Sequence, residues 1–139
     1  MGKAATCVRQ KGGGVNPARR SGPRAHCWVS SPDSRVVLSG DLGLDQVLSY
    51  RLDDDDGKLT IPREPFVRTP AGAGPRHLTF HPNGRRVYVI HEPSNAVSVL
   101  DYKQRRGVLM ERQRLSNLPA GLHSHRHCEV GRAAWRARA

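Results

Sequence analysis

The sequence predicts an all-β fold made of β-propeller blades, that is, four-stranded antiparallel sheets arranged as an incomplete ring. From residue 26 onwards short apolar segments alternate with turn residues, and the same pattern returns 50 residues later. The 14 glycines and 10 prolines favour turns over long helices. With 37% hydrophobic and 5% aromatic residues, the 139-residue chain has material for one small domain and little for a large core.

The first repeated unit is predicted to contain four short strands separated by turns. A Ser-Pro-Asp-Ser turn at 31–34 follows the first strand, and a polar loop at 41–45 follows the second. Asp41 and Asp45 are interpreted as Asx-turn residues that satisfy backbone groups, and a ligand-binding role is the alternative. Four aspartates at 53–56 with Gly57 are read as a solvated turn, because the ligand spacing of a calcium loop is missing. The strands are expected over residues 26–30, 35–39, 46–52 and 58–61.

The second unit matches the first at a constant offset of 50, without a gap across 26–60 and 76–110. Identical residues occur at Pro32 and Pro82, Arg35 and Arg85, Val37 and Val87, Val47 and Val97, Gly57 and Gly107, and Leu59 and Leu109. A period near 50 made of four strands is typical of propeller blades, and the alternative is two unrelated hairpins that share turn residues. Because two blades cannot close a ring, the chain is expected either to self-associate through exposed blade faces or to be a piece of a longer protein.

The net charge of +11 is concentrated at the two ends of the chain. Residues 1–24 carry +6, residues 25–101 carry −2 and residues 102–139 carry +7. Basic ends can bind phosphate backbones, but no aromatic platform or base-reading helix accompanies them, so no specific nucleic-acid partner is expected. Solvated tails are the alternative reading of the same charge.

Three divisions of the chain follow from composition. They are a basic, glycine-rich N-terminal segment (1–22), two blades (23–118) and a basic tail expected to be disordered (119–139). The N-terminal segment is read as loop, except for an edge strand suggested near residues 6–8. The tail changes character abruptly, which either a short basic helix or translation in a foreign reading frame would explain. Its run His123, His125, His127 and Cys128 offers zinc ligands, but alternating histidines in such a tail usually bind nothing, and no metal or cofactor is expected.

The three cysteines Cys7, Cys27 and Cys128 form neither a disulfide framework nor a paired metal motif. A reducing compartment is the simplest setting for them. No apolar stretch approaches a membrane span and no signal-peptide core is present at the N-terminus, so we expect a soluble cytoplasmic protein without a membrane partner.

Candidate site residues gather in the stretch 72–92, which reads as a hairpin. If its two strands pair, Arg76 and His77 lie at the same end as His91 and Glu92. The repeat places His26 in the position equivalent to Arg76, so both are expected to face the channel from one end. Each has a structural alternative: His26 as an ordinary histidine at a strand start, and Arg76 in a salt bridge, Glu92 being one possible partner.

The residues resemble the lactonase family of seven-bladed β-propellers, which includes bacterial 6-phosphogluconolactonase and the fungal carboxy-muconate lactonising enzyme. The resemblance covers residues 8–121, about a third of a full family member. It is carried by Gly14-Val15-Asn16-Pro17-Ala18-Arg19-Arg20, Gly22-Pro23-Arg24-Ala25-His26, Ser31-Pro32-Asp33, Asp41-Leu42-Gly43-Leu44-Asp45, Gly72-Ala73-Gly74-Pro75-Arg76-His77 and His81-Pro82-Asn83-Gly84.

The resemblance implies that His26, Arg76 and Glu92 match the family's proposed catalytic residues, while an arginine of a later blade is absent. Arg24 stands where the family often has a first histidine, and His91 stands where an asparagine usually precedes the glutamate. Both are departures from the family pattern.

The function implied by the resemblance is ring opening of a carbohydrate-derived lactone, 6-phosphogluconolactone being the model substrate, without a metal. His26 is the expected base, Glu92 shares or orients it, and Arg76 binds a carboxylate, a phosphate or the developing oxyanion. With Arg76, His77 and His91 are the expected substrate-binding residues for a small anionic lactone. The alternatives are an inactive propeller remnant or interaction module, and a basic nucleic-acid-binding protein. Neither the particular lactone nor the choice between hydrolase and cycloisomerase follows from these residues.

Overall fold

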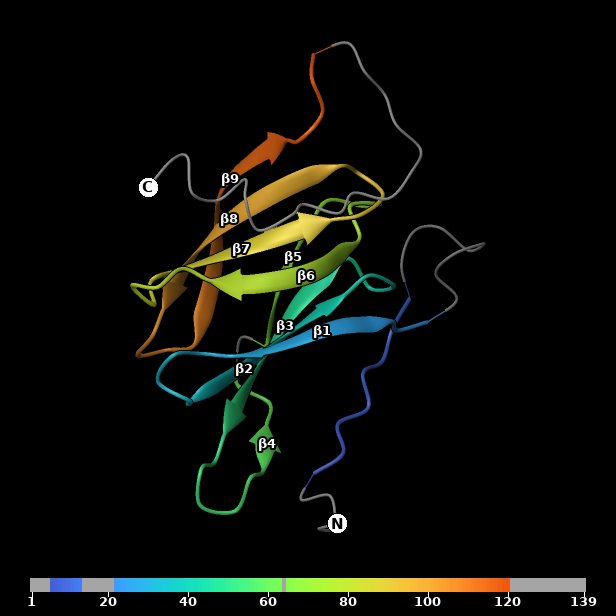
Figure 1. Cartoon of the computed structure of the whole chain (residues 1–139). Coiled ribbons are helices and arrows are strands. Elements are labelled where there is room, and N and C mark those ends of the chain that lie inside the picture. The colour runs from blue at the N-terminus through green and yellow to red at the C-terminus, as the bar shows by residue number, and fades with distance from the viewer. Residues whose placement is uncertain (1–5, 14–21, 64, 121–139) are drawn as a thin grey trace.

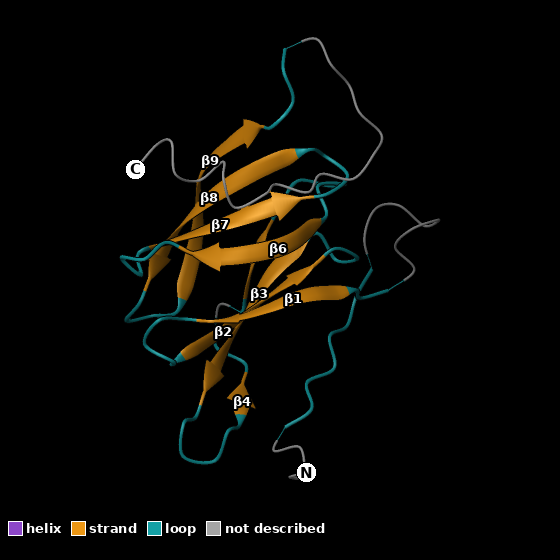
Figure 2. Ribbon diagram, in the orientation of Figure 1, coloured by secondary structure: helices purple, strands orange, loops and turns teal. Residues whose placement is uncertain are grey.

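The computed structural model describes residues 6–13, 22–63 and 65–120, and this part of the chain forms two antiparallel β-sheets (Figure 1). Among these residues every regular element is a strand, and no helix capable of crossing a membrane occurs (Figure 2). The strands are β1 (Ala25–Ser30), β2 (Val36–Asp41), β3 (Gln46–Leu52), β4 (Leu59–Thr60), β5 (Phe66–Arg68), β6 (Pro75–Phe80), β7 (Arg86–His91), β8 (Ala96–Lys103) and β9 (Val108–Ser116).

The first sheet has the order β1-β2-β3-β4, and β5 also pairs with β3. β3 has the predicted bounds, whereas β2 begins one residue later than expected and continues to Asp41. The predicted fourth strand is split, since β4 pairs with the end of β3 and β5 with its beginning. Pro62 and Pro65 lie between the two pieces, and a proline cannot donate to the hydrogen-bond ladder.

The second sheet has the order β6-β7-β8-β9 and an uninterrupted fourth strand. The repeat is visible in the pairing, because Val37 lies opposite Tyr50 in the first sheet and Val87 lies opposite Leu100 in the second. Positive φ angles also recur at the offset of 50, at Ser34 and Gly84, Asp45 and Asn95, and Gly57 and Gly107. The predicted all-β fold of four-stranded units, without a closed ring, is therefore confirmed.

The core lies between the two sheets. Val36, Leu38 and Val47 on one face of the first sheet pack against the face of the second sheet that carries Val87 and Val89. Leu38, Val47, Val87 and Val89 are fully buried. Removal of this apolar surface from water is the main contribution to the stability of the two packed sheets. Propeller blades also stack by burying such faces against their neighbours.

The other two faces differ in what covers them. Residues 6–13 run beside the first sheet without forming the edge strand that the sequence suggested near residues 6–8, and the side chain of Gln10 donates to Ser39 Oγ and Tyr50 Oη, both at 3.1 Å. On the far face of the second sheet, Met110 is 57% exposed and Leu115 is 52% exposed. None of the described residues covers this face, and it is where the predicted self-association would take place. The segments predicted as 1–22 and 119–139 fall mostly outside the described residues, and the histidine-cysteine run at 123–128 falls entirely outside them.

Candidate functional site

His26 and Arg76 occupy the same position in two neighbouring strands. Each is the extra residue of a β-bulge, one between Ala25 and Cys27 and the other between Pro75 and His77. β1 and β6 are the first strands of their sheets, and they are in contact with each other (Figure 1). A bulge redirects the side chain of its extra residue, so both side chains leave the regular alternation of their strands.

Arg76 forms an ion pair with Glu92, with 3.1 Å between Nη1 and Oε2. The side chain of Arg76 is 30% exposed and that of Glu92 is 15% exposed, so the pair is only partly open to water. The Nε atom of Arg76 is buried and has no hydrogen-bond partner among the described residues. A buried N–H without a partner is unfavourable, whereas a carboxylate or phosphate oxygen can reach the exposed part of the same side chain.

The loop before β6 is held by Asp45. The Asp45 carboxylate accepts from the backbone N of Gly72 at 3.0 Å and of Gly74 at 2.9 Å. Its carbonyl oxygen accepts from the backbone N of Thr69 at 2.9 Å and from Thr69 Oγ1 at 3.0 Å. Glu92 is tied to the same loop, because its backbone N donates to Gly74 O at 3.1 Å. Asp45 therefore fixes the segment that places Arg76 opposite Glu92.

Asp41 plays a similar role for the chain that enters β1. Its Oδ1 accepts from the backbone N of Arg24 at 2.8 Å and of Leu44 at 2.9 Å. Asp41 is fully buried, and its second oxygen has no partner within the part of the chain that the structure describes. The interpretation of Asp41 and Asp45 as residues that satisfy backbone groups agrees with these bonds.

His91, the repeat counterpart of Asp41, points into the layer between the sheets and is fully buried. Its Nε2 lies 2.7 Å from Ser98 Oγ, which donates to Glu111 at 2.8 Å and accepts from Arg114 Nε at 3.1 Å. Burial above all, and then the charge of Arg114, lower the pKa of His91 to about 4, against the opposing effect of Glu111 and Asp45. The ring is thus neutral at pH 7.

The structure brings together only some of the predicted site residues. Arg76 and Glu92 are paired, and His26 and His77 are exposed on the adjoining strands. His91 lies at the expected end of the hairpin, opposite Pro75, but its ring would have to leave the interior to reach a substrate.

The hydrogen-bond partner of His91, Ser98, was not predicted from the sequence. The one available signal was Ser98, which interrupts the apolar alternation of Ala96, Leu100 and Tyr102 along β8. Within the described ranges, no group of three histidine, cysteine, aspartate or glutamate side chains is arranged to hold a metal ion.

Comparison with known proteins adds a family match and several relatives. The family model described as "Lactonase, 7-bladed beta-propeller" matches residues 1–135. An uncharacterized protein of Staphylococcus saprophyticus is 45% identical over 87 residues, which is 61% of this chain and 24% of that protein.

Two solved structures are similar in fold and sequence. A candidate 6-phosphogluconolactonase of Bacteroides fragilis has 29% identity and a TM-score of 0.74, over 84% of this chain and 34% of that one. The periplasmic gluconolactonase PpgL of Pseudomonas aeruginosa has 34% identity and a TM-score of 0.73, over 82% and 32%. The present chain therefore spans no more than about a third of the length of these proteins.

Proposed function

The chain belongs to the lactonase family of seven-bladed β-propellers, and from this premise we propose that it supplies part of a site that opens the ring of a carbohydrate-derived lactone. The observation that carries the proposal is the Arg76–Glu92 pair, in which the carboxylate holds an arginine side chain that stays partly exposed to solvent. Similar structures described as 6-phosphogluconolactonase and gluconolactonase point to the same substrate class.

In the proposed reaction a water molecule attacks the lactone carbonyl while an imidazole accepts its proton. His26 is the candidate base, because it is exposed at the bulge equivalent to that of Arg76. The oxyanion that forms on the carbonyl then collapses, the bond to the ring oxygen breaks, and the proton passes to that oxygen to give a hydroxy acid.

Arg76 is proposed to bind negative charge, either on the substrate's phosphate or carboxylate or on the developing oxyanion. Glu92 orients the guanidinium through the 3.1 Å ion pair, and the exposed part of the Arg76 side chain is left for the ligand. His77 follows Arg76 on β6 and is proposed to contact the same ligand. His91 is proposed to support the site from inside the sheet layer, since its ring is fully buried.

The proposal can be tested first without turnover. Gluconate and 6-phosphogluconate, the products of such a reaction, would be titrated into ¹⁵N-labelled protein while the Nε–H resonance of Arg76 is followed. We expect a saturable shift of this resonance that is reduced in Glu92→Gln, and Arg76→Gln identifies the resonance by its disappearance. The exposed Arg51 on β3 provides a control, because Arg51→Gln should leave the shift unchanged.

Hydrolysis of 6-phosphogluconolactone, measured by proton release, tests the catalytic part. We expect His26→Gln to lower the rate by about 10²-fold or more, the range for a general base, and Arg51→Gln to have no effect. Binding without turnover would favour the inactive-remnant alternative for this chain. Absence of both would refute the proposal. The expected cytoplasmic location stays a prediction, and one similar structure is that of a periplasmic protein.

A further inference from the structure

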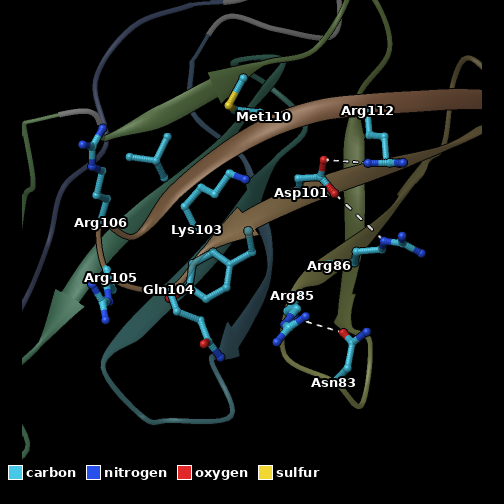
Figure 3. Close-up of a pocket in the computed structure, with 12 residues that line it drawn as sticks. Asn83, Arg85, Arg86, Asp101, Lys103, Gln104, Arg105, Arg106, Met110 and Arg112 are labelled. Atoms are coloured by element: carbon cyan, nitrogen blue, oxygen red, sulfur yellow. Dashed lines mark hydrogen bonds and ion pairs between the residues drawn. The ribbon is translucent and has the colours of Figure 1, made fainter.

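A basic pocket lies at the end of the second sheet that is remote from Arg76 (Figure 3). It has a volume of about 860 Å³ and is formed mainly by the β6–β7 turn, the β8–β9 turn and the adjoining strand ends. Six cationic side chains and one carboxylate, Asp101, line it. The cationic residues are Arg85, Arg86, Lys103, Arg105, Arg106 and Arg112.

The carboxylate does not neutralise this charge. Asp101 accepts from Arg112 at 3.2 Å and lies 4.0 Å from Arg86, so it is occupied by two of the six cations (Figure 3). In the part of the chain that the structure describes, no ion pair involves the other four, namely Arg85, Lys103, Arg105 and Arg106. All four line the pocket and are exposed to solvent.

The fold does not require basic residues here. The equivalent turn of the first sheet has the same geometry, with a bond from Gly57 N to Asp53 O at 2.8 Å and a φ of 67° at Gly57. In the second sheet Gly107 N donates to Lys103 O at 2.8 Å, and φ is 66°. Yet the first turn carries four aspartates at 53–56, whereas the second reads Lys-Gln-Arg-Arg. Formation of the turn therefore does not explain why the second turn is basic.

The pocket is separate from the lactone site. β7 runs from Arg86 at the pocket to His91, which pairs with Pro75 beside Arg76. Five residue steps along a strand correspond to about 17 Å. A ligand in the pocket would thus not contact the Arg76–Glu92 pair.

We propose that this pocket binds a small oligophosphate, a chain of two or more linked phosphate groups. Guanidinium groups offer paired donors that match phosphate oxygens, and several of them on facing turns suit several phosphates in a row. The aromatic residue of the lining, Tyr102, is only 3% exposed, so it offers no face for a nucleobase. Recognition therefore rests on phosphates and not on bases.

Calorimetric titration of the full chain with inorganic tripolyphosphate and with orthophosphate tests the proposal. We expect saturable tripolyphosphate binding, much weaker orthophosphate binding, and a loss of about tenfold or more in tripolyphosphate affinity in Arg105→Gln/Arg106→Gln. Binding should also weaken between about 0.1 M and about 1 M salt, where the screening length falls from about 10 Å to about 3 Å. ATP should bind no more tightly than tripolyphosphate, because only phosphates are recognised, and clearly tighter ATP binding would contradict the proposal.

A charge-matched control separates the pocket from the basic ends of the chain. Arg19→Gln/Arg20→Gln removes the same charge from an adjacent arginine pair elsewhere in the sequence and should leave the affinity within about twofold. Circular dichroism would verify that both double variants keep the β-sheet spectrum. Three results would each overturn the proposal. The first is an equal loss of tripolyphosphate affinity in the two double variants, and the second is equal affinity for orthophosphate and tripolyphosphate. The third is a preference for a thymidine oligonucleotide over tripolyphosphate that depends on the pocket arginines.

Discussion

Replacing Asp45 with alanine is expected to destabilise the loop that carries Arg76 by about 3 kcal/mol. The Asp45 carboxylate accepts from the backbone N of Gly72 and of Gly74, and Gly74 is buried. A buried N–H left without a partner costs about 1–3 kcal/mol, while the half-buried Gly72 N can turn to water at a smaller cost. Asp45 also adopts a φ of 55°, which alanine tolerates less well, by about 1 kcal/mol.

Such a loss is a large share of the roughly 5–15 kcal/mol that stabilises a typical domain. With a urea dependence of about 1–3 kcal/mol per molar, a loss of about 3 kcal/mol should lower the midpoint of unfolding by about 1–3 M. Urea unfolding followed by far-UV circular dichroism measures this directly. The same variant should shift the Nε–H resonance of Arg76, because the Asp45 bonds fix the segment that leads into β6.

Asp45→Asn provides the matched control. The amide keeps one oxygen acceptor and the tolerance of asparagine for positive φ, so we expect roughly half the loss of the alanine variant. A loss below about 0.5 kcal/mol in Asp45→Ala would show that the two backbone bonds do not hold the loop. Equal losses in both variants would show that the carboxylate oxygens are not what matters.

Two further predictions use the unfolding free energy as the readout. Gly74→Ala should lower the free energy of unfolding by about 2 kcal/mol or more, because φ is 62° and the new Cβ would lie 2.6 Å from Pro93 Cδ. Gly72→Ala is the control: φ is 87° but the space around it is open, so the loss should be about 1 kcal/mol. Similar losses in the two variants would rule out the close contact as the cause. The second prediction concerns His91, whose pKa is lowered from 6.5 to about 4 in the folded chain. As the pH falls, His91 is protonated in the unfolded chain before it is protonated in the folded chain, which favours unfolding. The free energy of unfolding should therefore fall by up to about 3 kcal/mol between pH 6.5 and about pH 4. This pH-dependent loss should vanish in His91→Gln and persist in the exposed His77→Gln, and its persistence in His91→Gln would contradict the assignment.

Much of the fold was predictable because it rests on local patterns. The alternation along Gln46–Leu52 and the turn residues that bound it gave β3 with its observed limits. The split of the fourth strand into β4 and β5 was not predicted, although Pro62 and Pro65 have no N–H to donate to the hydrogen-bond ladder. The weak pattern near residues 6–8 suggested a strand where the structure has a segment that lies beside the first sheet.

The site was predictable only in part. Hairpin pairing alone brings Arg76 and Glu92 to one end, and the 3.1 Å ion pair between them follows from it. The burial of His91 did not follow, because it depends on which face of the second sheet meets the first. The partners of His91 on β8 and β9, Ser98 and Arg114, likewise depend on side-chain directions that the sequence alone left open.

The amino-acid sequence by itself determined the strands, the turns, the 50-residue repeat and the neighbourhood of Arg76 and Glu92, because backbone preferences and side-chain alternation act over a few residues. Only the tertiary structure decided that Asp45 clamps the loop before β6, that the Nε of Arg76 is buried without a partner among the described residues, and that six cations and a single carboxylate line one pocket at the other end of the sheet. These features depend on contacts between residues distant along the chain, and such contacts are set by how the two sheets pack against each other.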